Sequence, residues 1–259
     1  MTEGSMALIG KEILNFKKVT STNDVLKRMA VLGTDEGVVV VASQQTKGRG
    51  RQEKKWYSPK NKGLYLSVLL RPKLDNRFIG LLSLYAALTV SQAISQISGL
   101  KVGVKWPNDI LVGDKKVAGI LVESSSAMSL RFVIIGVGIN IARRFFVRDK
   151  LRKTAGSLAE LSGKKIDHET LLQTVLQKMD EGYALLREEE IWRRTIIQGW
   201  CGFCVHLGQM VSIKTDNGVI DGVFAGVTET GEAVLKTESK SYTLNAGLCS
   251  MREYDASGD

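Results

Sequence analysis

Residues 64–100, LYLSVLLRPKLDNRFIGLLSLYAALTVSQAISQISGL, join a short apolar run to a long uncharged one. The first run, residues 64–70, stops before Pro72 and is typical of a strand covered on both faces. The second, residues 79–100, has no charged residue and reaches a helix-stop signal at Gly99. Its serines, threonine and glutamines favour a buried helix of a soluble core over a membrane span. We therefore predict a sheet with helices packed on it.

Other segments extend this pattern on both sides. Ser21 with Asp24 three residues later predicts a capping box at a helix start, and Asp167 predicts a second helix start. Further strands are expected in apolar, β-branched runs, at residues 37–42, 102–105, 110–112, 119–123 and 132–137. From residue 209 onward, short alternating segments are separated by turns at 216–218 and 230–231, as in a small β-barrel. We predict two domains, residues 1–206 and residues 207–259.

The charge is concentrated in one segment. The chain has 36 Lys and Arg against 27 Asp and Glu, a formal net charge of +9, and residues 47–62 contain Glu53 as their one acidic side chain. Such a cluster attracts phosphates, either of a nucleotide or of a nucleic acid. Three cysteines and two histidines cannot form a disulfide framework, which fits a cytosolic protein.

The basic segment contains the motif Gln45-Thr-Lys-Gly48-Arg-Gly-Arg51. Two glycines one residue apart let successive backbone N–H groups face one anion, and Arg49 and Arg51 can add forked hydrogen bonds. The spacing fits neither a P-loop nor a dinucleotide fingerprint. A solvated hairpin with scattered basic residues is the alternative interpretation.

Two further motifs lie at strand ends. In residues 105–109 (KWPND), Pro107 stiffens the backbone, so Lys105 is suited to act as a fixed cation, although an ordinary turn explains the pattern equally well. Residues 115–123 (KKVAGILVE) and 136–140 (GVGIN) place glycines in β-branched strands. Such glycines indicate close approach of a ligand, a bulge or tight strand packing.

The order of these motifs, from Ser21-Thr-Asn23 to residues 136–140, resembles the biotin protein ligases over almost the whole chain. The resemblance implies an α+β fold, with a mixed β-sheet and flanking helices like those of class II aminoacyl-tRNA synthetases, and a small SH3-like C-terminal barrel. Gln52-Glu53 replaces the Arg-Gly that often follows in the family. About twenty residues precede the first motif, which implies a form lacking the N-terminal DNA-binding domain.

The resemblance also implies the functional residues. Those around the ureido end of biotin are Ser21, Thr22, Asn23 and Gln45. Those of the loop that closes over biotin and the adenylate are Arg49, Gly50 and Arg51. Lys105 matches the lysine that contacts the biotin carboxylate and the phosphate. Those on the nucleotide are Trp56, which covers the adenine, Lys116 and Asn140. The catalytic group consists of Arg49, Arg51, Lys105 and Lys116.

The implied activity is ATP-dependent formation of biotinyl-5′-AMP, with Mg²⁺, followed by transfer of biotin to a lysine of a biotin carboxyl carrier protein domain of a carboxylase. No protein nucleophile is needed, which suits a chain without a Ser/His/Asp or Cys/His signature. The resemblance implies a cytoplasmic ligase that binds neither DNA nor a membrane, and it leaves homodimer formation open. Residues 46–62 are expected to become ordered on the adenylate.

Three alternatives remain beside this interpretation. Cys201-Gly-Phe-Cys204, with His206 and Cys249, is a candidate zinc or redox site. A nucleic-acid-binding module would use the basic segment, although no helix-turn-helix, zinc-finger or RNP pattern accompanies it. A lipoate ligase would share the fold and the adenylate chemistry, but its Arg-Arg-x-Ser-Gly-Gly-Gly loop is absent.

Overall fold

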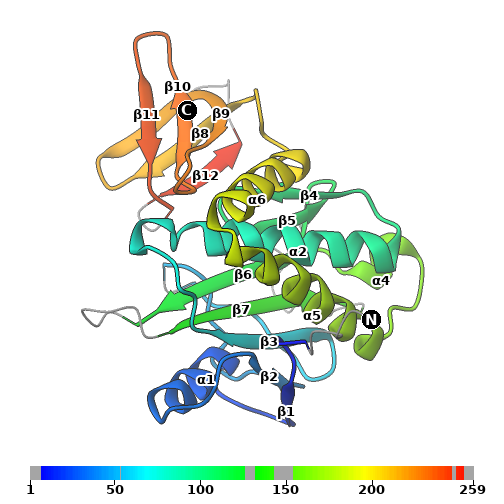
Figure 1. Cartoon of the computed structure of the whole chain (residues 1–259). Coiled ribbons are helices and arrows are strands. Elements are labelled where there is room, and N and C mark those ends of the chain that lie inside the picture. Colours follow the sequence, from blue (N-terminus) through cyan, green and yellow to red (C-terminus); the bar gives the residue numbers. More distant parts are fainter. Residues whose placement is uncertain (1–6, 53, 126–131, 143–153, 247–248, 254–259) are drawn as a thin grey trace, which may run out of the picture.

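The fold consists of a large mixed sheet with helices on it and a smaller antiparallel sheet at the C-terminal end (Figure 1). A computed structural model describes residues 7–52, 54–125, 132–142, 154–246 and 249–253. The seven strands of the large sheet lie in the order β1 (Glu12–Phe16), β2 (Val38–Ala42), β3 (Gly63–Leu70), β7 (Val133–Asn140), β6 (Lys115–Ser124), β5 (Asp109–Val112) and β4 (Val102–Lys105). β1 pairs with β2 in parallel, and the other neighbouring strands of the described sheet are antiparallel.

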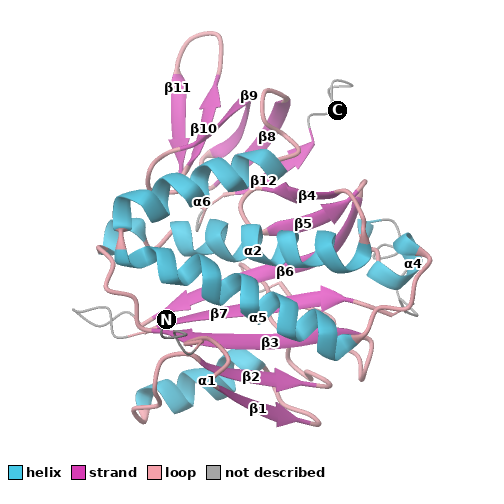
Figure 2. Cartoon of the chain, turned by 45° about the vertical axis from the view of Figure 1, so that its right-hand side comes forward, coloured by secondary structure: helices cyan, strands magenta, loops and turns pink. Residues whose placement is uncertain are grey.

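Helices cover the two faces of the large sheet unequally. The three longest lie together on one face (Figure 2), namely α2 (Leu81–Ser98), α5 (His168–Ala184) and α6 (Glu189–Phe203). α1 (Thr22–Val31) packs against β2, β3 and β7 from the other face. The shorter helical elements are η1 (Asn76–Phe78), α4 (Leu158–Ser162) and η2 (Leu185–Arg187). Among the described residues, no long helix besides α1 covers this second face, and the pocket described below lies there.

The side chains of β3 show why both faces are needed. Leu66 and Val68 point into the main core beneath α2, whereas Leu69 joins a second cluster with Leu26 of α1. Because successive side chains of a strand point to opposite faces, this apolar strand must be covered from both sides. Ser67 points toward α1 as well and bonds to its first residues.

α2 is the central helix of the main core. It is long and apolar enough to span a membrane by composition, but 72% of its residues are buried inside the protein. It packs against α5, α6 and the sheet, and it ends at Gly99, which adopts a left-handed conformation (φ 71°). The uncharged stretch thus serves as a core helix of this fold.

The C-terminal strands form the second sheet. Their order is β11 (Ser241–Leu244), β10 (Ala233–Lys236), β9 (Gly218–Val227), β8 (Met210–Thr215) and β12 (Ser250–Glu253). The fully buried Phe224 of this sheet meets the fully buried Trp200 of α6 edge-on, with 6.4 Å between ring centroids. The apolar cores of the two sheets are therefore continuous.

The predicted mixed sheet with flanking helices and a small C-terminal β-domain is confirmed. The predicted start of the helix near residue 21 is correct, but its capping box is wrong. Ser21 is the N-cap residue but makes no side-chain cap bond, and the carboxylate of Asp24, which would complete the box, binds Arg49. The strands β1 and β12 and the helix α6 were not predicted. The division at residues 206 and 207 stays a prediction.

Candidate active site

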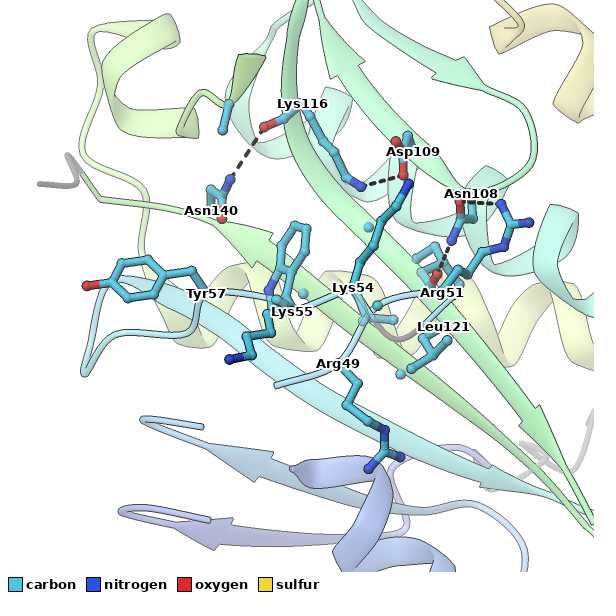
Figure 3. A pocket seen from close by; sticks show the side chains of 18 of the residues that line it. Arg49, Arg51, Lys54, Lys55, Tyr57, Asn108, Asp109, Lys116, Leu121 and Asn140 are labelled. Carbon is cyan, nitrogen blue, oxygen red and sulfur yellow. Dashed lines mark hydrogen bonds and ion pairs between the residues drawn. The ribbon is translucent and has the colours of Figure 1, made fainter. Parts of the chain in front are cut away.

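One pocket of about 590 Å³ opens on the sheet face that carries α1 (Figure 3). All the residues implied by the family resemblance line it. They are Ser21, Thr22, Asn23, Gln45, Arg49, Gly50, Arg51, Trp56, Lys105, Lys116 and Asn140. The arginine-bearing loop and the KWPND strand end, which are more than fifty positions apart in the sequence, thus face one cavity. Their roles toward a ligand stay predictions.

The floor of the pocket is made of glycines on adjacent strands. Gly119 of β6 pairs directly with Gly138 of β7, and the ring of Trp56 lies over both. Gly136 lies two positions before Gly138 on β7, and the side chain of Asn23 lies over it in the same way. A Cβ atom on Gly136 or Gly138 would overlap these side chains, so the glycines are required by close packing. In this structure, the groups that come close to these glycines are therefore two side chains of the protein, those of Trp56 and Asn23.

The roof of the pocket is a hairpin formed by the glycine- and arginine-rich motif. Gly50 N donates to Lys54 O (2.6 Å), and Trp56 N donates to Gly48 O (2.9 Å). A Cβ on Gly48 would come within 2.5 Å of the carbonyl oxygen of Trp56, so this turn needs glycine. The hairpin interpretation is therefore correct for the backbone, while the basic side chains of the hairpin line a pocket.

Arg49 points from this hairpin toward α1, away from the other labelled arginine of the pocket (Figure 3). Its guanidinium forms an ion pair with Asp24. In addition, Arg49 Nη2 donates to both carboxylate oxygens of Glu123, at 3.1 Å to Oε1 and 3.0 Å to Oε2. Burial alone would lower the pKa of Arg49, but the bonds to the two carboxylates outweigh it and raise the pKa. The cation of Arg49 is thus balanced by protein carboxylates.

Arg51 points to the opposite end of the pocket. It donates to the backbone oxygen of Cys249 (2.9 Å), just before β12, and approaches Asn108 Oδ1 at 3.5 Å. Burial lowers its pKa, and the charge of Asp109 partly restores it. Since an arginine stays protonated even so, this end of the pocket keeps a half-buried positive charge. Met251 of β12 also lines the pocket, so the C-terminal sheet contributes to it.

Two lysines lie at the same end. Lys105 is the half-buried last residue of β4, and its Cα pairs with that of Asp109. Lys116 Nζ lies 2.5 Å from Asp109 Oδ1 and 5.3 Å from the centre of the Trp56 ring, within cation–π range. Asn140 donates to the backbone oxygen of Gly156 (2.9 Å) and fastens the end of β7 to the segment before α4.

A chain of hydrogen bonds fixes the polar residues at the α1 end. Gln45 Oε1 accepts from Thr22 N (2.9 Å) and Thr22 Oγ1 (3.2 Å), while Gln45 Nε2 donates to Ser58 Oγ (2.9 Å). Ser67 Oγ lies 2.7 Å from Thr22 Oγ1 and 2.5 Å from Asn23 Oδ1. The side-chain amides of Gln45 and Asn23 therefore have defined orientations before any ligand binds.

Sequence reasoning missed three residues that hold the predicted site residues by hydrogen bonds. No role was predicted for Ser58, which binds Gln45, or for Ser67 and Glu123, which bind Asn23. A serine inside the apolar run of residues 64–70 was a usable signal, because a buried hydroxyl needs a partner. The contact of Arg51 with Cys249 had no such signal, since 198 positions separate the two residues.

The cysteine motif does not form a metal centre in the described part of the chain. No group of three or more His, Cys, Asp or Glu side chains is placed there to hold a metal ion. Burial raises the pKa of Cys201, and it raises the pKa of Cys204 to about 11. Burial thus disfavours the thiolate form of both side chains, which is the form that takes part in redox exchange.

The comparisons with known proteins point in one direction. Residues 15–140 match the biotin/lipoate A/B protein ligase family, and residues 206–252 match the biotin protein ligase C-terminal domain. The bifunctional ligase/repressor BirA of Bacillus subtilis is 32% identical over 89% of this chain and 71% of its own length. The biotin–[acetyl-CoA-carboxylase] ligase of Paracoccus denitrificans is 28% identical over 85% of this chain and 92% of its own.

Solved structures agree with the sequence relatives. The biotin protein ligase from Aquifex aeolicus, in complex with biotin and ATP, is 32% identical and superposes with a TM-score of 0.82. That comparison covers 94% of this chain and all of the other. The C-terminal match is to a domain that is named for the biotin protein ligases. This chain, with its glycine-floored pocket and second sheet, belongs to the biotin protein ligase family.

Proposed function

We propose that this protein joins biotin to ATP, giving biotinyl-5′-AMP and pyrophosphate, and then transfers biotin to a lysine of a carrier protein. In the first step a biotin carboxylate oxygen attacks the α-phosphorus, and the bond to the bridging oxygen of pyrophosphate breaks. In the second step the ε-amine of the acceptor attacks the acyl carbon, and AMP leaves with the electron pair of its bond. The proposal is supported above all by the single pocket that gathers both motifs.

The distribution of charge along the pocket supports one orientation of biotin. At the α1 end, Arg49 is neutralised by Asp24 and Glu123, and the remaining groups are amides and hydroxyls. Such an end suits the uncharged ureido group of biotin. At the other end lie three cations, Arg51, Lys105 and Lys116, against the two carboxylates of Asp109 and Asp114. That excess of positive charge suits the carboxylate of biotin and the phosphates of ATP.

The residues act by positioning and by fixed charge. As the carboxylate approaches the α-phosphorus, negative charge gathers on the phosphoryl oxygens, and preorganised cations such as Lys105 and Arg51 stabilise it. We assign Trp56 to the adenine side, with Lys116 over its ring and Asn140 holding the end of β7. The hairpin roof, residues 48–56, would keep water from the readily hydrolysed adenylate.

We propose that Mg²⁺ enters with the phosphates of ATP. Mg²⁺ prefers oxygen ligands and is commonly held by one or two carboxylates together with substrate phosphates. Among the described residues that line the pocket, Asp109 and Asp114 are the two carboxylates. Their oxygens are of the type that Mg²⁺ prefers and are paired here with Lys116 and Lys115. They would hold the ion, which would supply positive charge against the phosphate oxygens.

The acceptor that we propose is a biotin carboxyl carrier protein domain of a carboxylase. The family match to biotin protein ligases supports a protein lysine as the acceptor. The proposed location is the cytosol, where free thiols such as Cys201, Cys204 and Cys249 stay reduced. Association of two copies stays a prediction.

The decisive experiment is incubation of the protein with ATP, Mg²⁺ and either biotin or lipoate, with pyrophosphate release as the readout. We expect release with biotin and at most background release with lipoate. A carrier domain added in a second step should gain biotin on one lysine, detected by mass spectrometry. Release that depends on lipoate, or that does not depend on biotin, would overturn the proposal.

A further inference from the structure

Glu123 lies behind the pocket and holds two of the residues that line it. Asn23 Nδ2 donates to Glu123 Oε2 at 2.6 Å, and Arg49 Nη2 donates to both carboxylate oxygens of Glu123 at 3.0 and 3.1 Å. Asn23 and Arg49 line the pocket, and Glu123 and Asp24 are not among the described residues that do. One carboxylate on β6 thus joins the start of α1 to the hairpin roof.

The bond from Asn23 decides which way its amide faces. Asn23 Oδ1 accepts from Ser67 Oγ at 2.5 Å, on the side opposite the carboxylate. A flipped amide would set its oxygen against the negative charge of Glu123 and lose that bond. Because Asn23 is 2% exposed and packed over Gly136, it cannot turn away to solvent instead. The remaining N–H and lone pair of this amide therefore have fixed directions.

Asp24 provides an internal comparison, because it binds Arg49 as Glu123 does but does not share the bond between Glu123 and Asn23. Its carboxylate forms an ion pair with Arg49, as that of Glu123 does. The described contacts of Asn23, however, run to Glu123 and Ser67, and Asp24 is not among them. Removing the charge of Asp24 therefore disturbs Arg49 alone, while removing that of Glu123 disturbs Arg49 and Asn23 together.

We propose that Glu123 is a positioning residue for the uncharged end of biotin, acting through Asn23 and Arg49. This inference rests on the proposed function. A preset donor and acceptor pattern binds a ureido group without reorganisation, so its loss weakens ground-state binding of biotin. The cationic end of the pocket, where the phosphates are expected, is left intact. The effect should therefore appear in the KM for biotin and hardly in the KM for ATP.

The test measures pyrophosphate release by wild type, Glu123→Gln, Asp24→Asn and Glu181→Gln. Glu181 is an exposed glutamate of α5 paired with Lys178, so its variant is the matched control for loss of a carboxylate charge. We expect Glu123→Gln to raise the KM for biotin roughly ten- to hundredfold, as for one charged hydrogen bond. Asp24→Asn should raise it less, and Glu181→Gln should leave it unchanged.

A double-variant cycle tests whether Glu123 acts through Asn23. The variant Glu123→Gln/Asn23→Ala should raise the KM for biotin by less than the product of the two single effects. If Glu123→Gln does not fold, as judged by its Tm, Glu123→Asp is measured in its place. It keeps the charge but withdraws the carboxylate, so the same shift in the KM for biotin is expected.

Two results would overturn the inference and leave the proposed function standing. One is a wild-type KM for biotin in Glu123→Gln, and the other is an equal rise in the KM values for biotin and ATP. Multiplicative effects in the cycle would likewise exclude a role through Asn23. If wild type itself shows no biotin-dependent release, the proposed function fails, and the inference falls with it.

Discussion

Lys105 is the residue on which the charge argument depends most. It ends β4 beside the paired Asp109, on a backbone held in the sheet by β5. A cation fixed in this way needs no reorganisation when negative charge develops at the reacting phosphoryl group.

We expect Lys105→Ala to lower the rate of biotin-dependent pyrophosphate release by roughly 100-fold or more, because one preorganised cation is lost. The Tm should change little, since the side chain is half exposed and lies at a strand end. Lys101→Ala, an exposed lysine just before β4, is the matched control. Near-normal release by Lys105→Ala would show that the cation has no part in adenylate formation.

Arg51 contributes differently, because it joins the hairpin roof to the C-terminal sheet through the backbone oxygen of Cys249. We expect Arg51→Ala to release biotinyl-5′-AMP into solution faster, by roughly tenfold or more for one charge-assisted contact. The measurement is free adenylate formed without an acceptor. Lys47→Ala, in the same segment but exposed, is the control. Equal leakage from Arg51→Ala and wild type would contradict this role.

At the scale of elements, the pocket floor depends on two adjacent strands that lack side chains where Trp56 lies. Gly119 and Gly138 face each other across β6 and β7 beneath its ring. The alternation of β7 makes this possible, because the intervening Val137 and Ile139 point to the opposite face and fill the main core.

We expect Gly138→Ala to displace Trp56 from the floor, because the new methyl group would overlap the indole nitrogen. Tryptophan emission should shift to longer wavelength, and the KM for ATP should rise more than that for biotin. Gly202→Ala, in α6, is the control, since nothing lies within 4 Å of its added Cβ. An unchanged spectrum together with an unchanged KM for ATP would show that Trp56 does not depend on this glycine.

The strands and helices that could be predicted are those with an unbroken pattern of their own. The apolar runs of β2, β3 and β7 and the uncharged α2 were evident because each is covered on both faces or surrounded by the core. The edge strand β1 and the amphipathic α6 were missed. β1 has a mostly exposed pattern, and its pairing with β2 is decided by the neighbouring strand.

At the scale of the whole molecule, the two sheets share one apolar core. Phe224 and Leu235 of the smaller sheet belong to the same buried cluster as Trp200 and the residues of α2. The second sheet also reaches the pocket, through Met251 and the carbonyl of Cys249. A protein built in this way is expected to unfold as one cooperative unit.

We expect Phe224→Ala to lower the free energy of unfolding by about 3–5 kcal/mol, the usual cost of truncating a buried aromatic side chain. Calorimetry should still show a single transition, at a lower Tm, because the cavity lies in the shared core. Val219→Ala, exposed on β9, should have little effect. Two separate transitions, of which only one moves, would show that the sheets unfold independently.

The sequence by itself determined the fold class, the family and the candidate residues of the pocket. These depend on local patterns and on the order of motifs, which can be recognised without coordinates. Only the tertiary structure decided which partners those residues have. Arg49 binds Asp24 and Glu123, Trp56 lies on Gly119 and Gly138, and Arg51 reaches the C-terminal sheet. These contacts join segments up to 198 positions apart, and strand register and packing, which no local pattern encodes, bring them together.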